Sequence, residues 1–160
     1  MNWLELFSTT ALAAFFGAAS AFALSLLSER RAKHRRARML IQEAIANHLS
    51  ALDEFAKNSV QLIFTRHQLT AVAGYSVDVE LPQPSLGLLA VSIESASTLL
   101  PKNGQKVVRA ELKALRDPAN KASGASDTEF AKNEQVQVEE FSRRFAAWDG
   151  KSKTFPNQSH

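Results

Sequence analysis

Apolar and polar residues follow a helical period along most of the chain, and one segment near its start is apolar throughout. From Leu6 to Ser28 there are 23 residues without a charged side chain, bounded by Glu5 and Glu29. As a helix, this segment would be about 34 Å long, enough to cross a hydrocarbon layer of about 30 Å. The pattern therefore predicts a transmembrane helix over 6–28, preceded by a short N-terminal tail, 1–5.

Glycine and proline divide the rest of the chain into stretches with helical periodicity. The first stretch, 29–73, contains neither residue type. Its apolar residues recur at steps of three and four: Ile41, Ile45, Leu49, Leu52, Ala56, Val60 and Ile63. Three shorter helices are predicted over about 85–100, 104–116 and 126–150, the last opening with a capping box of Ser126 and Glu129. The alternating segment 75–81 has no partner strand, so we expect an extended connection there.

The apolar stripes of these helices can close into one antiparallel four-helix bundle, which predicts an all-α fold. The expected order is the span, a basic juxtamembrane segment 29–38, a cytosolic helical domain 39–150 and a flexible tail 151–160. Because no breaker follows residue 28, the span can continue into the first bundle helix as a rod of about 100 Å. The same pattern also fits a short coiled coil. Part of so long a helix must be exposed, reach the membrane or pack on another chain.

Charge adds an orientation to this picture. The net charge of the 160 residues is +3, but six cations form a collar directly after the apolar segment: Arg30, Arg31, Lys33, Arg35, Arg36 and Arg38. Residues 39–160 hold 13 lysines and arginines against 14 acidic residues. The positive-inside rule predicts a single-pass protein of the cytoplasmic (inner) membrane, with its N-terminus outside and its C-terminal domain in the cytoplasm.

Anionic lipid headgroups are the expected partner of this collar. Nucleic acid would bind through its phosphates, but a duplex has little room so close to a bilayer. Two other interpretations of 6–28 remain, a cleaved signal peptide and a buried helix of a soluble protein. A signal peptide normally has positive charge before its apolar run, whereas residues 1–5 have none, although 21–23 has the form of a cleavage site.

Small residues recur at every fourth position of the predicted span, from Thr9 to Ser25. Each step advances about 400° around a helix, so the stripe drifts and only Ala13, Gly17 and Ala21 can face one partner together. Such residues let two helix backbones approach closely in lipid, which predicts helix pairing. An alanine-rich span can also produce this spacing by accident.

Residue patterns of known catalytic sites are absent from the sequence. There is no cysteine, no glycine-rich phosphate loop, no HExxH motif and no GxSxG motif. His48 and His67 are 19 residues apart on one predicted helix, too far to share a metal, and neither His34 in the collar nor His160 at the end of the chain has neighbouring metal ligands. The adjacent acidic pairs 53–54 and 139–140 point about 100° apart on their helices. We expect a non-enzymatic protein without a metal, cofactor or small-molecule substrate.

The predicted function is an interaction or assembly subunit at the cytoplasmic face of a membrane, binding a protein partner or copies of itself. The alternative is a membrane-perturbing oligomer, a toxin or pore subunit, built on the small-residue stripe.

Overall fold

A computed structural model describes residues 3–74, 81–119 and 126–156, with side chains from residue 16 onwards except at 73, 118 and 119. This part of the chain is all-helical, with α1 (Trp3–Ala73), α2 (Leu86–Ser97), α3 (Lys102–Ala119) and α4 (Asp127–Ala147). The predicted helical bundle is thereby confirmed. The extended connection predicted over 75–81 lies outside the described residues except for Leu81.

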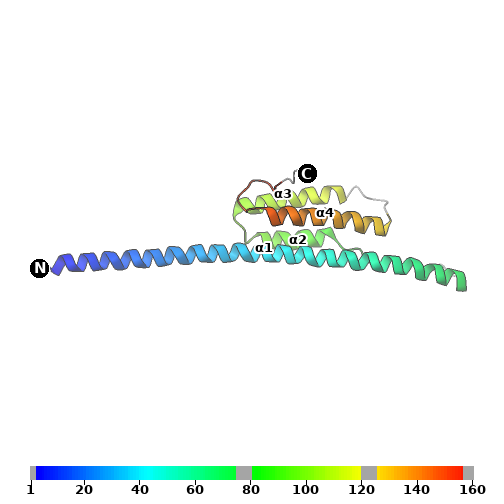
Figure 1. Cartoon of the computed structure of the whole chain (residues 1–160), viewed down its shortest axis with the longest axis horizontal. Coiled ribbons are helices and arrows are strands. Elements are labelled where there is room, and N and C mark those ends of the chain that lie inside the picture. Colours follow the sequence, from blue (N-terminus) through cyan, green and yellow to red (C-terminus); the bar gives the residue numbers. More distant parts are fainter. Residues whose placement is uncertain (1–2, 75–80, 120–125, 157–160) are drawn as a thin grey trace.

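α1 is one uninterrupted helix and is much longer than the bundle (Figure 1). Its 71 residues extend over about 105 Å at 1.5 Å per residue. Gly17 lies within the helix without breaking it. The middle of α1 packs against the other helices, while both of its ends project beyond them. The excess length expected from the sequence is therefore present as two projections.

The four helices form a ring in which successive helices run antiparallel (Figure 1). α1 contacts α2 and α4, and α3 contacts the same two helices on the other side. Fully buried side chains from all four helices make up the core, among them Ile41, Ile45, Ile93, Val108, Val138 and Phe145. The core therefore lies at the level of residues 37–55 of α1.

The helix boundaries follow local signals in the sequence. Ser126 and Glu129 form the predicted capping box, with the main-chain N–H of Glu129 donating to the Ser126 hydroxyl and the Ser126 N–H donating to the Glu129 carboxylate, both at 3.4 Å. α3 begins directly after Pro101, slightly earlier than predicted. Proline lacks an N–H group, which costs nothing at the start of a helix.

The C-terminal segment, residues 150–156, differs from the flexible tail predicted over 151–160. Phe155 is 1% exposed, and its ring centroid lies 5.5–5.8 Å from those of Phe141, Phe145 and Trp148. The indole N–H of Trp148 donates to the carbonyl of Ser152 at 3.1 Å. A single aromatic residue without periodic neighbours carries no helical signal, so the sequence pattern did not reveal this packing. Residues 157–160 lie outside the described chain.

Within the residues that the structure describes, no helix has an apolar stretch long enough to cross a membrane. The transmembrane helix predicted over 6–28 therefore gains no support here. Its first part, 6–15, has side chains that lie outside the described residues.

Candidate functional site

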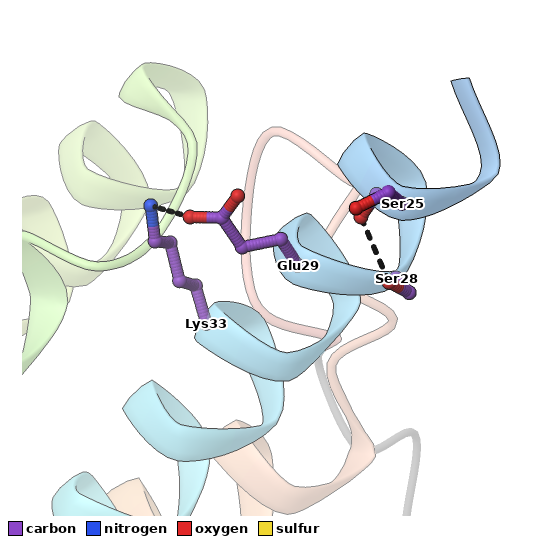
Figure 2. Close-up of polar contacts among 4 residues, drawn as sticks. All are labelled: Ser25, Ser28, Glu29 and Lys33. Atoms are coloured by element: carbon purple, nitrogen blue, oxygen red, sulfur yellow. Dashed lines mark hydrogen bonds and ion pairs between the residues drawn. The ribbon is translucent and has the colours of Figure 1, made fainter. Parts of the chain in front are cut away.

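The collar lies on α1 where the helix enters the bundle. Arg30, Arg31, Arg35 and Arg36 are exposed. Lys33 forms an ion pair of 2.7 Å with Glu29 one turn earlier, as Figure 2 shows. This hydrogen bond and the positive charge of Lys33 lower the pKa of the Glu29 carboxyl. The four exposed arginines therefore carry most of the uncompensated charge of the collar.

Arg38, the sixth collar residue, binds the end of α4. One guanidinium nitrogen donates to the main-chain oxygens of Phe145 (3.3 Å), Ala146 (3.2 Å) and Trp148 (2.6 Å). The group also lies 5.6 Å from the centroid of the Phe145 ring. The last carbonyls of a helix lack intrahelical partners and carry partial negative charge. Arg38 thus caps α4 and joins it to α1, a role the sequence pattern did not indicate.

His34 brings the collar against the C-terminal segment. Gly150 has a φ of 80°, which favours glycine, and a Cβ atom at this position would lie 3.0 Å from the His34 ring. The turn after α4 therefore lies beside α1 at the level of the collar.

The three predicted pairing residues lie on the N-terminal projection of α1. Gly17 and Ala21 are exposed, and a Cβ at Gly17 would meet no atom within 4 Å. The side chain of Ala13 lies outside the described residues. Within one chain, no other element that the structure describes packs on Gly17 or Ala21.

Large apolar side chains of the same projection are exposed. Phe22 and Leu24 are each 67% exposed, Leu27 is 50% exposed and Leu26 is 42% exposed. At 100° per residue these four positions spread over about 200° of the helix circumference. Gly17 and Ala21 lie on the remaining side. No side of the helix between residues 16 and 28 is charged.

The C-terminal projection of α1 has apolar residues gathered on one side. Val60, Ile63 and Phe64 are 58%, 53% and 64% exposed, and their spacing of three and four places them on one face of the helix. α4 runs antiparallel to α1, since Arg38 meets its end and Leu52 packs near Ala131 at its beginning. These three apolar residues follow Leu52 and Phe55 along α1 and, unlike them, are exposed.

One buried polar pair escaped sequence analysis. The His48 Nε2 atom lies 2.7 Å from the Glu134 Oε1 atom, and the side chains are only 8% and 2% exposed. The signal was present: Glu134 occupies the same stripe as Ala131 and Val138, where a charged residue requires a partner. His48 likewise stands in register with Ile41, Ile45 and Leu52.

Among the described residues, no group of three or more histidine, aspartate or glutamate side chains is placed to hold a metal ion. Beside the collar, an open groove of about 510 Å³ is lined by Leu24, Leu27, Ser28, Arg31, Ala32 and Arg35. It joins apolar and cationic side chains on one helix face, a combination that suits an amphipathic anion.

Comparisons with known protein families, curated proteins and solved structures found no match for this chain.

Proposed function

We propose that this chain is a non-enzymatic interaction subunit, held at a membrane by the N-terminal projection of α1, with its bundle on the cytoplasmic side. The observation that carries the proposal is the exposure of Phe22, Leu24, Leu26 and Leu27 around more than half of the helix. A helix without charge on any side that exposes apolar side chains around most of its circumference is stable when an apolar medium surrounds it. A single protein partner would cover one face, whereas lipid covers all of them.

The hydroxyl groups of this segment support the same interpretation. Ser28 Oγ donates to the Ser25 carbonyl at 2.8 Å (Figure 2), and Ser20 Oγ donates to the Phe16 carbonyl at 2.7 Å. A polar group in hydrocarbon is costly unless it has a hydrogen-bond partner. Because the Ser20 and Ser28 hydroxyls each have a partner within their own helix, lipid can surround them at low cost.

The exposed collar arginines provide the expected orientation. They follow directly after the apolar segment, on the side where the bundle lies. Cytoplasmic flanks of single spans are enriched in such residues. Anionic headgroups would attract them by about 1 kcal/mol for each charge near the surface.

The C-terminal projection of α1 is the proposed contact for another protein chain. Val60, Ile63 and Phe64 present one apolar face, which suits a helix or groove on a partner better than it suits lipid. Anchoring would confine partner and subunit to one surface, so that modest contacts suffice. The partner is either a second copy of this chain or a different membrane protein.

Membrane attachment is tested on the full chain expressed in bacterial cells. We expect it to stay in the membrane pellet after alkaline carbonate extraction. Phe22→Asp combined with Leu24→Asp should release it, because each aspartate in a span costs up to about 3 kcal/mol. Met39→Asp with Val91→Asp is the matched control, since both residues are exposed on the bundle. Extraction of the unchanged chain by carbonate would refute membrane attachment.

Orientation and partners are tested on the same membranes. The chain has no cysteine, so a single Thr154→Cys variant can report its location; it should react with an impermeant maleimide only after the cells are opened.

For partners, crosslinked membranes are solubilised in mild detergent and co-purified proteins are identified by mass. Phe64→Glu should remove the crosslinked species and the exposed Thr65→Glu should not. Products unaffected by Phe64→Glu would exclude this face as the contact.

A further inference from the structure

The end of the bundle that faces the N-terminal projection of α1 is assembled from three separate parts of the chain. In Figure 1, α3 begins at this end and α4 finishes there. Arg38 of α1 binds the carbonyl oxygen of Trp148 at 2.6 Å. A Cβ at Gly104 of α3 would lie 3.1 Å from the Trp148 ring. Trp148 therefore marks the point where α1, α3 and the end of α4 meet.

Three lysines from outside α1 lie at this end. Lys102 is the first residue of α3, and Lys151 and Lys153 belong to the turn after α4; all three are exposed. No ion pair within the described residues engages their ammonium groups. The contact between Gly150 and His34 holds this turn against the collar. The fold thus adds three cations to the collar, although Lys102 and Lys151 are far apart in the sequence.

Two of the acidic groups at this end, Asp149 and Glu29, are already engaged, while Glu94 in the last turn of α2 is exposed. Asp149 Oδ1 accepts hydrogen bonds of 2.9 Å from the main-chain N–H groups of Lys151 and Ser152 and from the Ser152 hydroxyl. Glu29 is paired with Lys33. The opposite end of the bundle, by contrast, exposes Asp117, Asp127 and Glu129 besides Arg116. Among the residues that the structure describes, charge is therefore distributed unequally between the two ends.

We propose that Lys102, Lys151 and Lys153 form a basal surface that docks the folded bundle onto anionic phospholipids, in addition to the collar. This inference rests on the proposed membrane attachment and goes beyond it, because it gives the bundle a lipid contact and a fixed position. His34 lies five residues beyond Glu29, about 8 Å along the helix. Because His34 lies beside Gly150, the turn with Lys151 and Lys153 is at about this distance from the start of the collar. The distance is close to the Debye length at physiological salt, so the surface potential of an anionic membrane reaches the basal lysines.

The experiment uses the full chain reconstituted into vesicles that carry a nitroxide-labelled headgroup lipid. A fluorescent dye is attached through Thr154→Cys at the basal surface or through Asn133→Cys on α4, both exposed positions. With the dye at position 154 we expect quenching about twofold stronger in phosphatidylglycerol than in phosphatidylcholine vesicles, falling in concentrated salt. With the dye at position 133 we expect the same quenching in both lipids.

Charge variants identify the residues responsible. Lys102→Gln with Lys151→Gln and Lys153→Gln should reduce the quenching at position 154 to its phosphatidylcholine value. Lys113→Gln with Arg116→Gln and Lys132→Gln removes equal charge elsewhere on the surface and should leave it unchanged. A chain that floats with both vesicles but is quenched equally at position 154 overturns the basal surface alone. A chain that floats with neither overturns the membrane attachment as well.

Discussion

The guanidinium group of Arg38 lies 2.6 Å from the main-chain oxygen of Trp148, 110 residues later in the sequence. The same group reaches two further carbonyls at the end of α4. Arg38 thus has two neighbours of different kinds, the exposed collar arginines along α1 and the last turn of α4. It links the position of the bundle to the segment that we propose enters the membrane.

Arg38→Met should destabilise the bundle, because it leaves these carbonyls without a donor while preserving much of the side-chain volume. We expect a loss of about 1–3 kcal/mol in the free energy of unfolding. Arg36→Met is the control, since Arg36 is exposed, and should change stability by less than about 0.5 kcal/mol. Urea unfolding of the full chain in mild detergent measures both. Equal stability of the two variants would contradict the capping role.

The buried pair of His48 and Glu134 should behave as a coupled unit. His48→Leu or Glu134→Leu alone strands a buried polar group, which costs about 1–3 kcal/mol. The double variant should cost less than the sum of the single changes, with a coupling of about 0.5–3 kcal/mol, because leucine can pack where both polar groups are removed. Strict additivity in a double-mutant cycle would show that the contact contributes nothing.

Local sequence signals predicted the helices well. The absence of breakers over 29–73 predicted a long helix, and Ser126 with Glu129 predicted the start of α4. Such signals depend on the period of apolar residues and on backbone groups a few positions apart. They operate within one helix and so are visible without knowledge of the fold.

Contacts between helices were less predictable. His48 and Glu134 are 86 residues apart, and nothing in either helix alone identifies the other as its partner. In the sequence, Arg38 looks like any other arginine of the collar. In the structure, it is the collar residue that binds the main-chain oxygens at the end of α4. The basal lysines were not predicted for the same reason, since only the order of the helices in the ring brings the start of α3, with Lys102, to the end of α4.

Phe155→Ala should show that the C-terminal segment belongs to the core. Its ring is packed against three aromatic side chains, so truncation leaves a cavity and should cost about 3 kcal/mol. The exposed neighbour Thr154 provides the control, and Thr154→Ala should change stability by less than about 0.5 kcal/mol. Thermal unfolding followed by circular dichroism compares them. If Phe155→Ala unfolds at the wild-type temperature, the segment does not contribute to stability.

The stability of the segment should depend on pH through Asp149. Its hydrogen bonds to Ser152 and Lys151 lower the pKa of this carboxyl from 3.8 to about 2. A lowered pKa in the folded state stabilises the chain above pH 3.8 and loses that effect as the pH falls through about 2. Wild type should therefore be more stable than Asp149→Ala at pH 5, and the difference should shrink during acidification.

Urea midpoints measured between pH 5 and pH 2 test this dependence. Ser152→Ala removes only the hydroxyl donor and should reproduce part of the Asp149→Ala effect, with the same sign. A difference between wild type and Asp149→Ala that stays constant over the whole range would mean that the turn does not favour the ionised carboxylate.

Gly17→Ile should weaken any pairing of α1 in the membrane. Gly17 and Ala21 lie on the side of the helix that lacks large side chains, and no atom of the chain fills the space at Gly17. A close approach of two backbones at this stripe requires small residues. We expect the crosslinked dimer to decrease about fivefold or more, equivalent to about 1 kcal/mol.

Ala19→Ile is the matched control for pairing, because it adds a similar side chain about 200° away around the same helix. Both variants retain the apolar character of the segment, so both should remain in the membrane pellet. Loss of dimer in Gly17→Ile alone would assign pairing to the small-residue face. Equal loss in both variants would indicate a general disturbance of the helix, and full retention in Gly17→Ile would rule out pairing through Gly17.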